Sequence, residues 1–353
     1  MEDPGRFLFL FLKAAPCSCR CRHCDFAVSG AFPPLPLERA ISFVEPLLTV
    51  RGDPNAPFAN LAVFWGDGPL NHPSLAAGMR YLRAHDIEGW YSLAANGFHF
   101  RPRARWEPYL QELRAAGTGI LEFTLFGRDA THDWFALRPG DYAAILDLAD
   151  LWEQGGGETT WSVFAHKRNL GELAELRTHL GPRAERCRVG LWAHVGLAAD
   201  PAQEDLRLDA EDLSRLDAAD VAELGDVRPE GVWAAELIGS DANPHPARAR
   251  VIHLTVDGDG RASIPYKGGM HSGHTGALQI GRLPQESAVV MLENWERAYS
   301  RWREAYPSLG WLAEHCADRN GSKLHSRDSV IQKWCSRWEQ VRPACVPVPG
   351  ATR

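Results

Sequence analysis

Residues 17–24 read Cys-Ser-Cys-Arg-Cys-Arg-His-Cys and follow the short apolar run Phe7–Leu12. Three of these cysteines, Cys17, Cys21 and Cys24, have the spacing C-x3-C-x2-C. Cysteine sulfur holds iron–sulfur clusters, and a cubane [4Fe-4S] cluster has one more iron than this set has ligands. The stretch therefore predicts a cluster with one open iron, which could bind a substrate or cosubstrate.

Zinc and disulfides are the alternatives for this cysteine loop. A structural zinc site usually takes its ligands from two pairs separated by a longer stretch, and no second pair at suitable spacing follows. Disulfides are disfavoured because no signal peptide precedes the loop: Met1–Arg6 carries Glu2 and Asp3 before its one basic residue. Cys19, the fourth cysteine, is interpreted as a loop residue that does not bind the cluster.

The length, composition and net charge of the chain limit the classes of protein and of binding partner to be considered. The chain has 353 residues, enough for about two domains, and an ordinary 45% of hydrophobic residues. Its net charge of -7 gives no reason to expect a nucleic acid or an anionic membrane as partner. The run Phe7–Leu12 is too short to span a bilayer. We expect a cytoplasmic protein in a reducing compartment.

Short apolar runs alternate with helical patterns in the N-terminal part of the chain. The expected strands are Phe7–Leu12, Asn60–Trp65, Gly89–Leu93, Gly119–Phe126, Thr159–Phe164 and Arg188–Val195. The expected helices are Leu37–Leu48, Ser74–His85, Trp106–Ala115, Asp141–Gln154 and Leu170–Leu180. Pro46 predicts that the first helix kinks or ends near Glu45. Six βα repeats predict a parallel α/β sheet with helices outside, and leave open whether it is an open sheet or a barrel.

The pattern changes in the C-terminal part. We expect a linker at Gly196–Leu206, an acidic helix at Asp209–Leu224 and an antiparallel pair of strands, Val251–Val256 and Ala262–Pro265, joined by the turn Asp257–Gly260. Two helical stretches, Gln285–Ala305 and Gly310–Gln340, follow. The glycine-rich stretch Lys267–Gly276 predicts a flexible loop, although His271 and His274 could bind a metal or line a pocket. These segments predict a small α+β cap over residues 201–353, after a core domain over residues 1–200.

The cysteine spacing and its place after the first strand resemble the radical S-adenosylmethionine (radical SAM) superfamily. In that family the open iron chelates the amino and carboxylate groups of SAM, and the reduced cluster cleaves SAM to methionine and a 5′-deoxyadenosyl radical. The resemblance implies a partial (β/α)6 TIM-like barrel with the cluster at its mouth, held by Cys17, Cys21 and Cys24. His23 stands where the family usually has an aromatic residue, so its ring could pack on the adenine of SAM.

Further markers follow the later strands in the order that the family shows. Gly66-Asp67-Gly68-Pro69 resembles the G-G-E-P stretch whose backbone approaches the SAM amine, with Gly68 at the usual Glu position. Ala95-Asn96-Gly97 resembles T-N-G, and Thr124 replaces a serine that contacts SAM. Each marker alone is typical of a turn. Their order at successive strand ends is the signal, because active sites of βα barrels lie at that face.

The stretch Val251–Leu283 weakly resembles the start of a SPASM-type extension, which holds auxiliary clusters through cysteines. It contains no cysteine, so one cluster per chain is expected. The resemblance implies a radical SAM enzyme that takes electrons from an external one-electron reductant such as flavodoxin or ferredoxin. Its expected substrate is a ribosomally made peptide, with a separate peptide-recognition protein as a further partner. A small-metabolite substrate, or a non-catalytic metal-binding protein, is the alternative.

Overall fold

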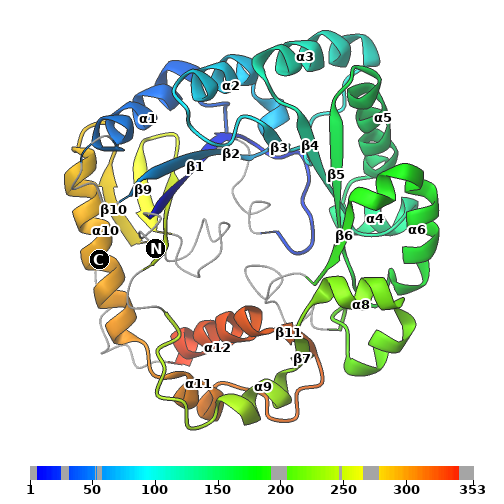
Figure 1. The fold of residues 1–353 in the computed structure, drawn as a ribbon, viewed down its shortest axis with the longest axis vertical. Helices are drawn as coiled ribbons and strands as arrows, with labels where there is room; N and C mark the ends of the chain where they lie inside the picture. Colours follow the sequence, from blue (N-terminus) through cyan, green and yellow to red (C-terminus); the bar gives the residue numbers. More distant parts are fainter. Residues whose placement is uncertain are drawn as a thin grey trace.

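A computed structural model describes residues 6–24, 32–51, 53, 58–191, 205–245, 249–264 and 278–341. Six parallel strands form a curved wall around the centre of the molecule (Figure 1). They are β1 (Phe7–Ala15), β2 (Asn60–Asp67), β3 (Ser92–Ala94), β4 (Ile120–Leu125), β5 (Glu158–Phe164) and β6 (Cys187–Gly190). The predicted partial barrel of α/β class is confirmed.

The helices cover the outer side of this wall (Figure 1). They are α1 (Leu37–Arg51), α2 (Leu75–Ala84), α3 (Arg103–Ala116), α5 (Asp141–Gln154) and α6 (Leu173–Leu180). Alternate strand residues, such as Leu8, Leu10 and Leu12 of β1, are fully buried in the core that these helices share with the strands. Successive side chains of a strand point to opposite faces, so the residues between them face the centre.

One of the two outcomes expected at Pro46, an end of the helix near Glu45, was wrong, and one short helix was not predicted. The helix α1 does not end near Glu45 but continues through Pro46 to Arg51, because Val44, Leu47 and Val50 stay buried against the core. A short helix that the sequence did not predict, α4 (Asp129–Ala136), follows β4. It buries His132 and Phe135 below the cysteine loop.

The expected antiparallel pairing of Val251–Val256, which forms β8, with the strand after the turn is confirmed. A second pairing of β8 was not predicted. This strand pairs parallel with β1, on the edge opposite β2, and antiparallel only with β9 (Arg261–Ile264). β10 (Leu278–Arg282) continues the sheet, and α10 (Ala288–Ala305) covers it. The C-terminal part therefore extends the barrel sheet itself.

Two further predicted helices are interrupted. The acidic stretch Asp209–Leu224 splits into a 3-10 turn, Ala210–Arg215, and α8 (Ala218–Leu224), because Asp217 accepts a hydrogen bond as the cap of α8. The stretch Gly310–Gln340 divides into α11 (Leu309–His315), β11 (Leu324–Ser326) and α12 (Arg327–Val341).

A second, smaller core lies at the end of the chain. It joins α11, α12 and α9 (Glu230–Leu237) around the fully buried Trp233 and Trp334, while β11 pairs with β7 (Val227–Pro229). The loop Lys267–Gly276, most of the linker Gly196–Leu206 and the end of the sixth predicted strand lie outside the described residues.

Candidate functional site

The cysteine loop starts where β1 ends and is fixed by its backbone to two later segments. The amide of Ser18 donates to the carbonyl of Gly97 at 2.8 Å. The amides of Arg20 and Arg22 donate to the last turn of α4, at Ala136 (3.2 Å) and Phe135 (3.0 Å). The loop thus lies at the C-terminal ends of the parallel strands, the end where βα barrels place their active sites.

The four thiols of the loop differ in their burial and interact with one another. Cys17, Cys21 and Cys24 are half-buried, whereas Cys19 is buried. The amide of Cys19 donates to the sulfur of Cys17 at 3.4 Å. A side-chain hydrogen bond to Cys19, together with burial, raises the pKa of Cys17 and of Cys21. The charge of Cys24 raises both pKa values further.

Two glycines leave room for Cys17. At Gly97, which has φ +74°, an added Cβ would lie 2.0 Å from the sulfur of Cys17. At Gly68 it would lie 2.5 Å from the carbonyl of Pro16 and 2.9 Å from the Cα of Cys17. Among the described residues, no three His, Cys, Asp or Glu side chains are already set as ligands of a single metal ion. The thiols on one short loop, with Cys17 packed closely against two glycines, fit an iron–sulfur cluster.

Cys19 also makes contacts outside the cysteine loop. Its sulfur lies 3.5 Å from Oδ2 of Asp141 and 3.8 Å from Nη1 of Arg138. The same carboxylate contacts Nε2 of His132 at 3.2 Å and Nη1 of Arg138 at 3.1 Å. Burial raises the pKa of Asp141, and the hydrogen bond from His132 opposes that rise. The Cys19 sulfur also shares side-chain hydrogen bonds with Cys17 and Cys21. Its exclusion from the ligand set stays a prediction.

His23 packs into an aromatic cluster rather than standing free. Its ring centroid lies 4.9 Å from that of Phe126, 5.4 Å from Phe135 and 6.0 Å from Phe164. Phe164 faces the centre of the barrel at the end of β5, so His23 lies beside the inward wall. Contact of His23 with adenine stays a prediction.

The markers after β2 and β3 come together through a residue that the sequence analysis missed. The side-chain amide of Asn71 donates to the carbonyls of Pro16 (2.8 Å) and Gly97 (2.9 Å), and its oxygen accepts from the amide of His99 (2.6 Å). Asn71 thereby links the three loops after β1, β2 and β3.

The other predicted contacts to SAM hold the backbone of the site. Asn96 donates from Nδ2 to the carbonyl of Thr124 (2.9 Å) and accepts from its amide (2.6 Å), which fixes the ends of β3 and β4 side by side. Gly66 faces the centre, where an added Cβ would meet the ring of Phe11 at 1.9 Å. Asp67 ends β2 opposite Ala15. Pro69 begins the buried turn that carries Asn71.

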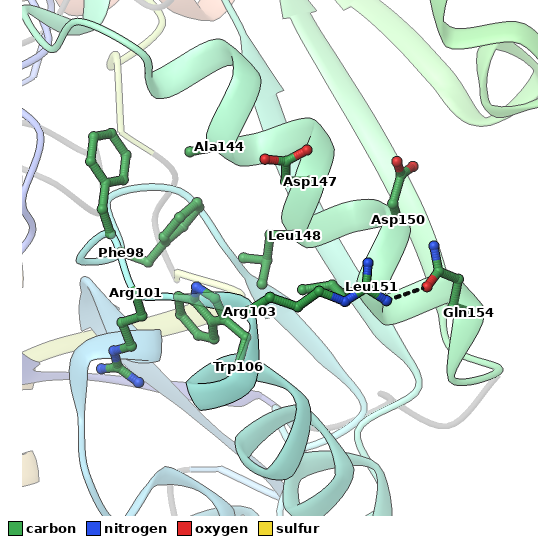
Figure 2. Close-up of a pocket in the computed structure, with 11 residues that line it drawn as sticks. Phe98, Arg101, Arg103, Trp106, Ala144, Asp147, Leu148, Asp150, Leu151 and Gln154 are labelled. Atoms are coloured by element: carbon green, nitrogen blue, oxygen red, sulfur yellow. Dashed lines mark hydrogen bonds between the residues drawn. The ribbon is translucent and has the colours of Figure 1, made fainter.

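Two cavities lie near the site. One, of about 360 Å³, borders the ends of β1 and β8 and is lined by Lys13, the segment 32–36, Arg39 and the turn 257–259. The other, of about 280 Å³, lies between α3 and α5 in the outer helix layer (Figure 2). There Arg103 donates to Gln154 at 2.7 Å beside Asp147 and Asp150. The first cavity belongs to the end of the barrel that carries the cysteine loop, whereas the second lies between helices.

Comparison with known proteins agrees with this architecture. No family model and no curated protein matches the chain. Among solved structures, anSMEcpe with bound AdoMet superposes with a TM-score of 0.56 at 12% identity, over 94% of this chain and 96% of that one. The complex of anSMEcpe with AdoMet and the Cp18Cys peptide gives 0.53 at 13% identity, over the same shares of the two chains.

SuiB of Streptococcus suis, bound to S-adenosylmethionine, gives a TM-score of 0.50 at 12% identity over 77% of this chain. The chain spans 62% of the length of SuiB. These neighbours are radical SAM enzymes, and the chain has their fold. At such identities the likeness shows the fold alone. The SPASM-like character of the extension stays a prediction.

Proposed function

We propose that the chain is a radical SAM enzyme whose single [4Fe-4S] cluster is held by Cys17, Cys21 and Cys24. The observation that carries the proposal is the position of these three thiols. They lie on the loop after β1, at the C-terminal end of the barrel strands, where two glycines allow the backbone to pack closely against Cys17. A cluster with an open iron, once reduced, supplies the electron that splits SAM into methionine and a 5′-deoxyadenosyl radical.

The residues of the chain orient the reactants and exclude water. The Asn71 and Asn96 side chains hold the ends of four strands, β1 to β4, in fixed register, so the backbone around Gly68 and Gly97 is fixed before SAM binds. The cluster that Cys17, Cys21 and Cys24 would hold, together with SAM, would supply the chemistry for abstraction of a hydrogen atom from the substrate, which these residues would help to orient. Such chemistry must be shielded from solvent, which the buried wall around the site favours.

We further propose a peptide substrate and a maturation role of oxidoreductase type, in the cytoplasm. The likeness in fold to anSMEcpe, whose structure with AdoMet and the Cp18Cys peptide superposes over most of the chain, supports the peptide class. An external one-electron reductant such as flavodoxin or ferredoxin, and a separate peptide-recognition protein, are the partners that this chemistry calls for. In the described part of the chain no helix is long and apolar enough to cross a bilayer.

The test is reductive cleavage of SAM. Protein reconstituted anaerobically with iron and sulfide, and reduced with dithionite, should convert SAM to 5′-deoxyadenosine, with about four irons per chain. Cys17→Ala, Cys21→Ala and Cys24→Ala should each lose the cluster absorbance and the product. Cys19→Ala, in the same loop, is the matched control and should keep both. An intact cluster that yields only S-adenosylhomocysteine would refute the proposal.

A further inference from the structure

The inward face of the barrel carries aromatic side chains on one side and polar side chains on the other. On β1, β2 and β8 four of the residues between the outward-facing core positions carry aromatic rings: Phe9, Phe64 and His253, which are half-buried, and Phe11, which is buried. Ala62, Gly66 and Thr255 occupy other positions of the same face. Ring centroids are 6.0 Å apart for Phe9 and Phe64, 5.4 Å for Phe11 and Phe64, and 5.8 Å for Phe9 and His253. These four rings form one continuous surface, the aromatic wall.

The inward face of β4, β5 and β6 is polar in its middle, before Phe164 at the end of β5. Its positions form two paired rows, Glu122 beside Thr160 and, one step nearer the cysteine loop, Thr124 beside Ser162 and Arg188. Glu122, Ser162 and Arg188 are exposed although they lie in the middle of strands. This polar wall stands across the centre of the molecule from β1 and β8 (Figure 1).

The carboxylate of Glu122 is the group of this wall that can accept further hydrogen bonds. Its carboxylate receives one hydrogen bond, from the hydroxyl of Ser92, and no ion pair to it occurs in the part of the chain described. Arg188 lies two strands away, roughly 10 Å at the usual strand spacing, so the two opposite charges do not neutralise each other. A carboxylate left unpaired on an inward face beside a hydroxyl attracts a cationic group.

We propose that the two walls form a substrate site for a peptide segment that carries an aromatic side chain and, close to it, a basic side chain. The aromatic side chain packs on the aromatic wall and the basic one pairs with Glu122. This inference deepens the proposed function and rests on it for the reaction, although binding can be tested without turnover. It makes Glu122 the residue that selects the charge of the substrate.

The two contacts have different energetic roles. Packing on the aromatic wall supplies most of the binding, because burial of an aromatic ring removes a large apolar area from water. The ion pair is half-exposed, so its contribution to affinity is modest. Its larger effect is discrimination, since an acidic residue at the same place would be repelled and desolvated. We expect about a tenfold preference for the basic peptide over the acidic one.

Three fluorescein-labelled nonapeptides of Gly and Ser provide the test. The first carries Phe and Lys two residues apart, the second Phe and Glu, and the third Ser and Lys. Their binding to anaerobically reconstituted protein with SAM is followed by fluorescence anisotropy. The first peptide should bind at least about tenfold more tightly than each of the others. Glu122→Gln should reduce the preference for Lys over Glu to about twofold or less, and Glu122→Lys should reverse it.

Glu107→Lys is the matched control, because Glu107 is an exposed glutamate on the outer helix α3 that pairs only with Arg103 there. It should leave the peptide preference unchanged. Equal binding of the three peptides, a preference that survives Glu122→Lys, or no binding at 1 mM peptide would overturn the inference. Failure of the wild type to cleave SAM would count against the proposed function alone, because the binding series does not depend on cleavage.

Discussion

At the scale of single residues, the cysteines were readable from the sequence and their surroundings were not. Spacing separates Cys17, Cys21 and Cys24 from Cys19, and the structure places Cys19 in its own contacts with Asp141. Asn71 was missed because its role depends on carbonyls that are distant in sequence, at Pro16 and Gly97. A side chain that links three loops leaves no local pattern.

Gly97→Ala should impair the cluster site directly. The new Cβ would overlap the sulfur of Cys17, and φ +74° adds about 1 kcal/mol of backbone strain. We expect iron content after anaerobic reconstitution to fall to less than about half of the wild-type value, since one of three ligands is displaced. Iron and labile sulfide analysis, with the visible absorbance of the cluster, is the measurement.

Gly140→Ala controls for the strain. Gly140 has φ +79°, and no atom lies within 4 Å of an added Cβ. This variant should lose a similar amount of stability and still bind the full complement of iron. Equal iron loss in both variants would show that strain, rather than the contact with Cys17, governs the site.

At the scale of elements, the sequence predicted most barrel strands and outer helices but not α4. The helix α4 is short and carries Asp129, Thr131, His132 and Asp133, so its polar composition is more typical of a loop than of a helix. Its stability comes from tertiary contacts, as is general for short helices. Its last turn accepts two backbone hydrogen bonds from the cysteine loop, and His132 contacts Asp141 at the start of α5.

The effects of substitutions at Cys19 and Asp141 on the free energy of unfolding should be coupled, because the two side chains are in contact. Asp141→Asn removes the carboxylate that pairs with Arg138, which should cost about 2–3 kcal/mol in the free energy of unfolding. Cys19→Ala should cost less. Because both changes remove the same contact, the double variant should be more stable than the sum of the single effects predicts, by about 0.5–1 kcal/mol. Urea unfolding followed by circular dichroism gives the four free energies.

Asp133→Asn provides the matched comparison for that cycle. Asp133 accepts from the amides of Gly140 and Tyr142, so it stabilises the same turn between α4 and α5, and no contact of it with Cys19 is found. Its effect should add to that of Cys19→Ala within about 0.3–0.5 kcal/mol. Full additivity of Asp141→Asn with Cys19→Ala would contradict the proposed role of this carboxylate in holding the loop.

At the scale of the whole molecule, the sequence gives little information on how the two parts of the chain pair with each other. The parallel partner of β8 lies more than 200 residues earlier, at β1, and alternation within Val251–Val256 says nothing about a partner so distant. The boundary near residue 200 stays a proposal. The same pairing brings His253 beside Phe9, so the aromatic wall combines residues from both parts of the chain.

The fold also makes stability depend on pH through buried histidines. Burial lowers the pKa of His166 and of His245 to about 4, and that of His325 to about 2. In the unfolded chain each has a pKa near 6.5, so the unfolded state binds more protons below that pH. The free energy of unfolding is therefore unaffected by these histidines above about pH 6.5. Below that pH it decreases as the pH falls, by about 1.4 kcal/mol per histidine per pH unit.

Thermal unfolding between pH 7.5 and 5.5 should show this loss as a steadily falling Tm below pH 6.5. His166→Gln isolates one contribution, because the amide of Gln can still donate to the carbonyl of Phe126, which Nε2 of His166 contacts at 2.8 Å, and Gln does not titrate. Below pH 6.5 the stability of the variant should fall less steeply with pH than that of the wild type, by the contribution of one histidine. At pH 7.5 its stability should be near that of the wild type. A wild-type Tm that stays constant down to pH 5.5 would mean that these histidines become protonated inside the folded molecule.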